Sequence, residues 1–357
     1  MTKPTDGHPG KVVVREVTAK TILNRTAISD YSLNCYTGCE HACVYCYARF
    51  MQRFHPHPEP WGEFVDVKVN AVEVLRRQLR RAPASGWRAP AGEVFVSSAC
   101  DGWQPVEARY ELTRRCCELL LERGFQVNVL TKSALVLRDL ALLTQSSTLR
   151  VGPAGGRARV GVTVTTLKEG LRKLWEPRTS TVEERFEVLG HAHAAGLKTA
   201  VMFGPLLPFL SDGEKDIDGL FARAADLKVD VIWVDALNPR PRVWPSVAAL
   251  LRRDPKGLSA HGPEFDPLRR RDLRGRRQPF DAAQGREPVE RQVKRDGVPR
   301  GRRQQAKRSG VPPELEGRYR AMLFDQEVRA QYLVGLRQRV HRAAARHRLT
   351  DRLRGCP

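Results

Sequence analysis

The sequence lacks any apolar run that approaches the roughly 18 residues needed by a membrane-spanning helix. Residues 1–10 also lack the apolar core of a secretory signal peptide. These two absences predict a cytoplasmic protein with no membrane partner. Of the 357 residues, 41% are hydrophobic and 28% are charged, which excludes wholesale disorder and fibrous or collagen-like classes.

Acidic residues are scarce relative to basic ones, because 40 Asp and Glu oppose 61 Lys and Arg, giving a net charge of +21. A basic balance is compatible with a nucleic-acid partner. The excess is uneven, since residues 252–310 carry +10, residues 311–357 carry +5 and residues 1–251 carry only +6. Charge alone therefore says little about the part of the chain with regular secondary structure.

The most basic segment, residues 252–310, also has few apolar residues and no sustained period of 2 or 3.6. Such a segment cannot bury enough apolar surface to offset the entropy of ordering, so it is predicted to be a disordered basic insertion. Two interpretations remain open. The insertion is either a tolerated surface segment or an arm that contacts phosphates.

Short β-rich runs alternate with helix-like stretches between residues 71 and 235. Near-continuous apolar runs, expected of parallel strands covered on both faces, lie at 94–99, 126–131, 159–165, 198–203 and 229–235. Helix-like stretches lie at 71–81, 108–123, 134–143, 181–195 and 212–226. This alternation predicts an α/β fold with a parallel sheet or a complete or partial barrel.

Polar side chains follow these predicted strands, at the end where barrel folds place their chemistry. Serine and threonine often end strands without any function, whereas a lysine after an apolar strand is harder to explain that way. The residues concerned are Ser97, Ser98, Asp101, Thr131, Lys132, Ser133, Thr163, Thr165, Thr166, Asp235 and Asn238.

Four of the eight cysteines lie within twelve residues, at Cys35, Cys39, Cys43 and Cys46. In a chain without a secretory signal, such clustering favours a metal site over disulfides. Thiolates suit zinc or iron–sulfur clusters. One alternative is a structural zinc site that uses all four sulfurs; the other is a cluster held by Cys39, Cys43 and Cys46 alone.

The C-x₃-C-x₂-C spacing of residues 39–46, with an aromatic residue before the last cysteine, resembles the signature of the radical S-adenosylmethionine (SAM) superfamily. The resemblance implies a partial (β/α)6 TIM-like barrel in which three thiolates hold a [4Fe–4S] cluster and the fourth iron chelates SAM. It further implies an external electron donor of flavodoxin or ferredoxin type. The reduced cluster would then cleave SAM to methionine and a 5′-deoxyadenosyl radical.

Further runs resemble the spore photoproduct lyase-like branch of that superfamily, over roughly residues 21–244. They are LNCYTGCEHACVYCYAR (33–49), SSACDGWQPVE (97–107), LTKS (130–133), EPR (176–178) and ER (184–185). The branch resemblance implies a lyase-like enzyme whose substrate is a nucleic-acid base lesion. Alternatives are radical modification of a small molecule or peptide, and a zinc- or cluster-stabilised nucleic-acid-binding module.

The resemblance also implies roles for residues that bind SAM. Tyr45 would pack near the adenine, and Lys132 would pair with the methionine carboxylate. Asp101 and its neighbours, including Ser98, would meet the methionine amine. The remaining cofactor positions it suggests are Thr163 and Thr165 near the ribose and Arg178, with Glu176, just beyond that strand.

One cysteine outside the loop, Cys100, is a candidate catalytic residue. Photoproduct lyases use a cysteine near the second strand to return a hydrogen atom, and Cys100 lies in that neighbourhood, although alignment on Asp101 places Ser98 nearer the donor position. Cys35 stands where the branch often has proline, so it is either a bystander or a fourth sulfur. Cys116 and Cys117 are expected in the core.

Residues 312–352 are predicted to form one or two helices. Tyr332, Leu336 and Val340 fall at i, i+4 and i+8, an apolar stripe that would dock on the barrel. The other faces carry arginines that are either solvated or in contact with phosphates. The predicted organisation is an N-terminal extension (1–30), a radical SAM partial barrel (31–251), a basic insertion (252–310) and a C-terminal helical segment (311–357).

Overall fold

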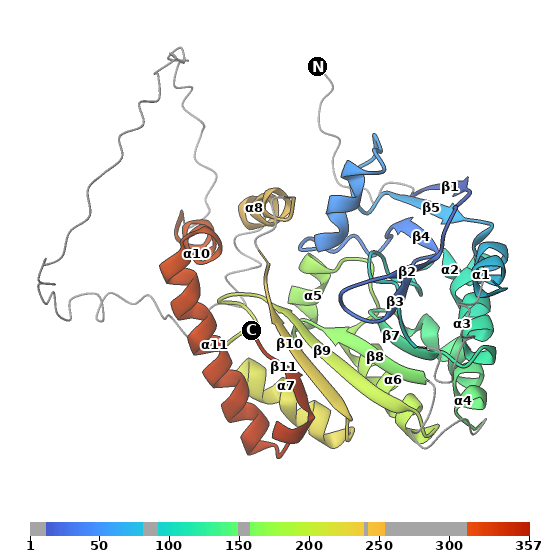
Figure 1. The fold of residues 1–357 in the computed structure, drawn as a ribbon. Coiled ribbons are helices and arrows are strands. Elements are labelled where there is room, and N and C mark those ends of the chain that lie inside the picture. Colours follow the sequence, from blue (N-terminus) through green and yellow to red (C-terminus); the bar gives the residue numbers. More distant parts are fainter. Residues whose placement is uncertain (1–11, 81–91, 149–157, 239–241, 254–312) are drawn as a thin grey trace, which may run out of the picture. The chain divides into compact units, whose positions relative to one another are not determined.

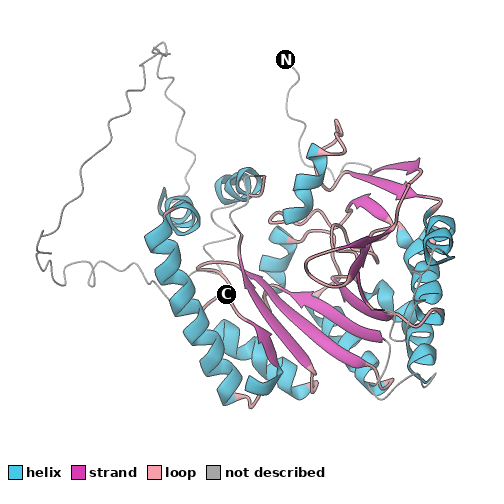
Figure 2. Ribbon diagram, viewed as in Figure 1, coloured by secondary structure: helices cyan, strands magenta, loops and turns pink. Residues whose placement is uncertain are grey.

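The chain is built around a mostly parallel β-sheet (Figures 1 and 2). The structure is a computed structural model that describes residues 12–80, 92–148, 158–238, 242–253 and 313–357. All of these belong to one compact unit, which joins residues 311–357 to residues 1–265. The predicted basic insertion lies outside the described residues, apart from its first two positions.

The large sheet contains eight strands among the described residues, in the order β11-β10-β9-β8-β7-β6-β3-β2. Neighbours pair in parallel from β3 to β11, and β2 runs antiparallel to β3. This is the parallel sheet of a partial α/β barrel, as predicted, although eight strands do not establish a count of six repeats. The strands are β2 (Leu23–Arg25), β3 (Tyr31–Leu33), β6 (Glu93–Val96), β7 (Gln126–Thr131), β8 (Ala158–Val164), β9 (Lys198–Leu206), β10 (Val231–Ala236) and β11 (Leu353–Gly355).

A second, three-stranded sheet was not predicted. It consists of β1 (Val13–Val17), β5 (Phe64–Lys68) and β4 (Tyr36–Gly38), with β5 between the other two. Both β1 and β2 fall in the segment expected to be an N-terminal extension. Because each pairs with strands further along the chain, residues 13–25 are part of the two sheets.

Helices pack along the large sheet, and all five helix-like stretches contain one (Figure 2). Gly124 and Gly196 adopt φ of +84° and +77° after α3 and α6, as expected of residues that end helices. The helices of this region are η1 (Tyr47–Arg53), α1 (Ala71–Arg80), α2 (Glu107–Tyr110), α3 (Leu112–Glu122), η2 (Ala134–Asp139), α4 (Leu140–Thr148), α5 (Glu169–Trp175), α6 (Val182–Ala194), α7 (Glu214–Asp226) and α8 (Trp244–Arg253).

The single helix predicted at 108–123 is broken into α2 and α3. Glu111 takes a left-handed φ of +51° at the break. The buried carboxylate of Glu107 then accepts hydrogen bonds from the backbone N–H groups of Thr113 and Arg114, both at 3.0 Å. These N–H groups begin α3 and would otherwise have no partner, so a tertiary cap replaces the continuous helix.

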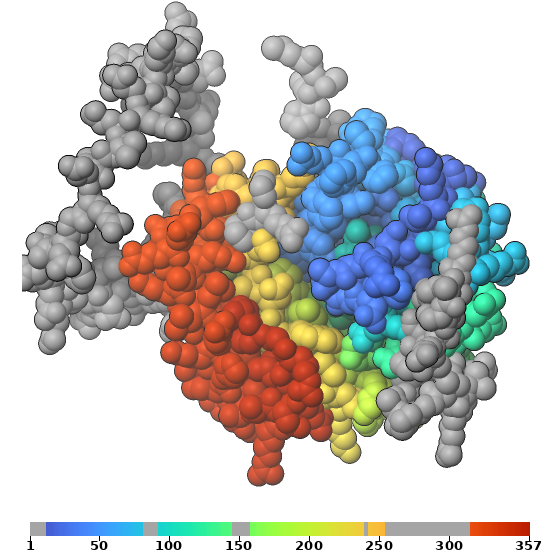
Figure 3. All heavy atoms as spheres, in the orientation of Figure 1, coloured from blue at the N-terminus to red at the C-terminus, as the bar shows by residue number. Residues whose placement is uncertain are grey.

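The C-terminal segment forms α10 (Pro313–Phe324) and α11 (Gln326–Arg346), followed by η3 (Thr350–Arg352). The predicted apolar stripe is confirmed, because Tyr332, Leu336 and Val340 are all buried. In the space-filling view, α11 lies against the yellow surface of α7 (Figure 3). No helix within the described ranges is long and apolar enough to cross a membrane.

The arginines of α11 bind carboxylates of the neighbouring elements. Arg342 Nε lies 3.1 Å from Glu214, and Arg346 Nη1 lies 2.5 Å from Asp218. Arg339 donates to the Asp212 carbonyl at 3.0 Å and lies 3.6 Å from its carboxylate. These three side chains therefore dock α11 and do not form an unpaired phosphate-binding face.

Candidate functional site

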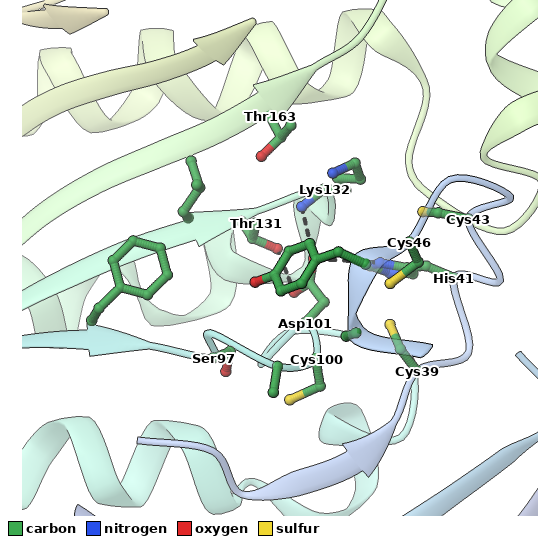
Figure 4. A pocket seen from close by; sticks show the side chains of 15 residues that line it. Cys39, His41, Cys43, Cys46, Ser97, Cys100, Asp101, Thr131, Lys132 and Thr163 are labelled. Carbon is green, nitrogen blue, oxygen red and sulfur yellow. Dashed lines mark hydrogen bonds and ion pairs between the residues drawn. The ribbon is translucent and has the colours of Figure 1, made fainter. Parts of the chain in front are cut away.

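The polar residues predicted at strand ends meet at one end of the sheet. Because β3, β6, β7 and β8 are neighbours and parallel, the residues that follow each strand emerge at the same edge. A pocket lies there (Figure 4). It is lined by Cys39, His41, Cys43, Cys46, Tyr47, Ala48, Phe95, Ser97, Ala99, Cys100, Asp101, Leu130, Thr131, Lys132 and Thr163.

The cysteine loop, residues 39–46, is held by hydrogen bonds from distant elements. The Val44 N–H donates to the Trp175 carbonyl at 2.9 Å, and the Ser246 hydroxyl donates to the Val44 carbonyl at 2.6 Å. At the other end, the Glu40 N–H donates to the Gln104 side chain at 2.8 Å. The loop is thus fixed by the rest of the barrel before any ligand binds.

The three predicted ligands, Cys39, Cys43 and Cys46, all line this pocket. Burial raises the pKa of each thiol, and that of Cys43 reaches about 12. Among the described residues, no three His, Cys, Asp or Glu side chains converge to hold a single metal ion. A cluster takes one thiolate per iron, so its ligands need only border a common space. Three soft donors on the wall of one pocket fit that requirement.

The fourth sulfur of the loop region lies elsewhere. Cys35 is fully buried, with its Sγ 3.8 Å from Cys116 Sγ, and it is not among the residues that line the pocket. The side chain of Cys35 therefore belongs to the core, together with Cys116 and Cys117. The four-cysteine zinc knot considered as an alternative is not assembled in this structure.

Asp101 organises the ends of two strands. Its carboxylate accepts hydrogen bonds from the Thr131 hydroxyl at 2.7 Å and from the Lys132 N–H at 2.8 Å, and it lies 3.4 Å from His41. Burial alone would raise the pKa of Asp101. The nearby His41 and the hydrogen bonds outweigh burial, so the pKa is held well below its usual range and the carboxylate is charged.

Lys132 projects a cation into the pocket. Its Nζ lies 5.7 Å from the centre of the Tyr45 ring, and no carboxylate of the described residues is within ion-pair distance of it. Its positive charge helps to lower the pKa of Glu176, but that carboxylate is already paired with Arg185. The position therefore suits an anionic group of a ligand, such as a carboxylate.

A buried polar network beneath the pocket was not predicted. Glu176 and Arg185 form an ion pair at 2.5 Å, with each side chain only 1% exposed. Burial alone would raise the pKa of Glu176, but Arg185 outweighs it and lowers the pKa to about 2. The same carboxylate accepts hydrogen bonds from the hydroxyls of Tyr45 and Thr165. The EPR and ER runs contain this pair, but the sequence did not predict that their side chains meet.

This network separates the two threonines predicted near the ribose. Thr163 lines the pocket, whereas the Thr165 hydroxyl lies within the network, 2.7 Å from the Glu176 carboxylate and 3.1 Å from the Gly204 carbonyl oxygen. The Tyr45 hydroxyl is also used there, so only its ring faces Lys132.

The other predicted residues also differ in whether they line the pocket. Cys100 lines the pocket, and burial raises the pKa of its thiol to about 12. Ser98 does not line it, because its hydroxyl accepts a hydrogen bond from Asn34 at 3.1 Å. Arg178 donates to the Gly62 carbonyl at 2.8 Å and so holds the segment that packs on the cysteine loop.

Ser97 lines the pocket in a backbone conformation that was not predicted from the sequence. It adopts a left-handed φ of +66° directly after β6, and its buried hydroxyl has no hydrogen-bond partner among the described residues. Such strain at a pocket wall is typical of functional sites. No pattern in the sequence signals this conformation.

Comparison with known proteins agrees with this geometry. Residues 33–220 match the Radical SAM superfamily. An uncharacterized protein of Mycobacterium tuberculosis is 31% identical over 287 residues, which are 76% of this chain and 81% of the relative. An uncharacterized protein of Methanocaldococcus jannaschii is 31% identical over 206 residues, which are 57% of this chain and 71% of the relative.

A solved structure extends the likeness to the fold. It is a double mutant of spore photoproduct lyase with bound AdoMet and dinucleoside spore photoproduct, and it superposes with a TM-score of 0.52. The match covers 75% of this chain and 74% of that one, at 15% sequence identity. At this identity the similarity is one of fold.

Proposed function

Because the chain belongs to the radical SAM superfamily, whose members typically use a [4Fe–4S] cluster and SAM, we propose that Cys39, Cys43 and Cys46 hold that cluster. The observation that carries the proposal is that all three thiols share one pocket with Asp101 and Lys132, at the ends of parallel strands. Bound there together, the cluster and SAM would supply a 5′-deoxyadenosyl radical.

The chain's own residues position SAM in this proposal. Lys132 pairs with the methionine carboxylate, and Asp101 fixes the strand ends beside the methionine amine through the bonds that it accepts from Thr131 and Lys132. Thr163 offers a hydroxyl to the ribose. The remaining predicted positions support these: Tyr45 and Thr165 through the Glu176 network, Ser98 through Asn34, and Arg178 through Gly62.

Cys100 is the proposed hydrogen-atom donor. Since the pKa of its thiol is raised to about 12, the sulfur keeps its hydrogen at neutral pH, and on the wall of the pocket its S–H group donates to Asn34 Oδ1 at 3.9 Å. A substrate radical formed there could take that hydrogen atom. We assign the substrate to the class of DNA base lesions, supported by the fold shared with spore photoproduct lyase. The cluster would receive its electron from an external flavodoxin or ferredoxin.

Anaerobic reconstitution tests the cluster assignment. The wild-type protein should be brown, hold about four irons per chain, and release 5′-deoxyadenosine with dithionite and SAM. Replacing Cys43 by Ala removes one ligand, so cleavage should fall by more than the roughly 10–100-fold cost of losing an outer-shell partner. The matched control, Cys35→Ala, removes a sulfur that does not line the pocket and should retain iron and cleavage.

Two outcomes would contradict this assignment. One is a colourless protein that holds a single zinc, and the other is full cleavage by Cys43→Ala. The substrate proposal is tested separately by product analysis after turnover with DNA that carries ultraviolet photoproducts. If SAM is cleaved but the DNA is not restored, the lesion proposal fails and the radical chemistry stands. Cys100→Ala should cleave SAM and lose repair.

A further inference from the structure

A second cation, Arg49, lies beside the cysteine loop without a counter-charge. It is in η1, three residues beyond Cys46, and its Nη2 donates to the Cys43 carbonyl at 3.1 Å. Its Nε is buried and has no hydrogen-bond partner, and no carboxylate of the described residues lies within ion-pair distance.

Trp61 approaches the same loop from the segment that precedes β5. It is 5% exposed and packs with Cys39, Ala48 and Phe64, and Cys46 lies at the edge of this cluster. The approach is close, because a Cβ on the adjacent Gly62 would lie 2.5 Å from the Ala42 Cβ. The segment therefore forms a tight cover over the loop.

The indole N–H of Trp61 is also buried and has no hydrogen-bond partner in ordinary geometry among the described residues. Cys46 packs against the cluster that contains Trp61, so its side chain is a neighbour of the indole. A buried donor without an acceptor destabilises the folded protein, and a buried cation without a counter-charge destabilises it more. Both costs would be offset if the adjacent sulfurs carried negative charge, as thiolate ligands do.

We propose that Arg49 and Trp61 stabilise the thiolates of Cys43 and Cys46 and thereby raise the reduction potential of the cluster. The inference rests on the proposed function. Reduction adds one electron to the cluster, so a nearby positive charge or N–H donor stabilises the reduced form more than the oxidised form. Both side chains act through the ligands and are positioning residues.

The test is a potentiometric titration of the reconstituted full-length protein without SAM, followed by electron paramagnetic resonance. Dithionite supplies the electron through redox mediators. Arg49→Met should become at least about tenfold harder to reduce at a fixed potential, which is a shift of 59 mV to more negative values for a one-electron couple. Arg49→Lys, which keeps the charge, should recover part of the shift.

Trp61→Phe keeps most of the shape but lacks the N–H, so it should shift the potential in the same direction by a smaller amount. The matched control is Arg53→Met, which removes an exposed arginine of the same helix and should titrate as the wild type does. The reduced wild type should show an exchangeable proton coupled to the cluster, which is the indole N–H proton of Trp61. This coupling should be absent from the reduced Trp61→Phe variant.

The outcomes are distinguishable. If the wild type holds no cluster, the proposed function fails. If the wild type holds about four irons and the cluster of Arg49→Met has the same reduction potential as that of the wild type, only this inference is overturned. Loss of iron from Arg49→Met, Arg49→Lys and Trp61→Phe alike would assign these side chains a purely structural role and would also overturn it.

Discussion

Two groups of basic side chains differ in what they face. On α11, Arg339, Arg342 and Arg346 each lie close to a carboxylate of α7 or to that of Asp212, two residues before it. Lys132 at the pocket and Arg49 beside the cysteine loop have no carboxylate within ion-pair distance among the described residues. A positive net charge in the sequence is therefore a poor guide to charge that is available for a ligand. The two cations without carboxylates lie beside the three thiols, where an anionic cofactor would bind.

A third arginine sharpens the comparison, because Arg185 is paired like those of α11 but completely buried. Exposed pairs contribute about 0–1 kcal/mol, since water and ions screen them. Removing one partner of a buried pair costs more, because the other charge remains in a medium of low dielectric. The number of ion pairs says less about stability than the burial of each.

The largest effect is expected from Arg185→Met. Glu176 would be left charged and buried, so the free energy of unfolding should fall by about 3–5 kcal/mol. The matched control is Arg223→Met, which breaks an exposed pair with Glu183 and should cost about 0–1 kcal/mol. Urea unfolding followed by circular dichroism measures both. Equal losses would remove the distinction between buried and exposed pairs.

A smaller effect is expected from the pH dependence of Asp212, the partner of Arg339. Burial raises the pKa of Asp212 to about 6, against an opposing effect of Arg339. Because the folded protein binds this proton more tightly than the unfolded chain, its contribution to stability should decline by about 3 kcal/mol as pH rises from about 4 to about 6. Above that range it should stay constant.

The measurement is the difference in unfolding free energy between the wild type and Asp212→Asn, taken across the same pH range. The asparagine variant lacks this titration, so the difference should decline with pH. A difference that grows with pH would mean that attraction to Arg339 outweighs burial. In that case every ion pair discussed on α11, including that of Arg339 with Asp212, would stabilise the folded protein.

The smallest of the three effects is expected at the pocket. Lys132→Met removes the proposed partner of the SAM carboxylate, a charged hydrogen bond worth about 1.5–3 kcal/mol, so SAM should bind about tenfold to a hundredfold more weakly. Arg342→Met, whose guanidinium already faces Glu214, should bind SAM as the wild type does. Equilibrium binding to reconstituted proteins of equal iron content checks this. Similar losses in both would show that net charge, not Lys132, attracts SAM.

Local pattern predicted much of the fold. The five apolar runs at 94–235 each overlap an observed strand, because parallel strands covered on both faces have a plain sequence signature. Features that depend on single side-chain contacts or on distant strands were missed. Glu107 breaks a predicted helix by capping α3, and β1 pairs with β5 some fifty residues later. Neither contact leaves a periodic signal.

The site follows the same division. Spacing identified Cys39, Cys43 and Cys46, and the ends of predicted strands identified Asp101 and Lys132, all of which line the pocket. Spacing could not tell that Cys35 turns into the core or that Thr165 binds Glu176 while Thr163 lines the pocket. Trp61 carries no motif at all.

By itself, the sequence determined which residues are candidates for the chemistry and that parallel strands would bring several of them to one edge. Cysteine spacing and strand periodicity are local properties, so they can be read along the chain. Only the tertiary structure decided which charges remain without partners. Pairing depends on side chains from distant segments, as when α11 meets α7 or Arg185 meets Glu176. For that reason the fold, and not the composition, identifies Lys132 and Arg49 as the cations near the thiols that lack a carboxylate partner.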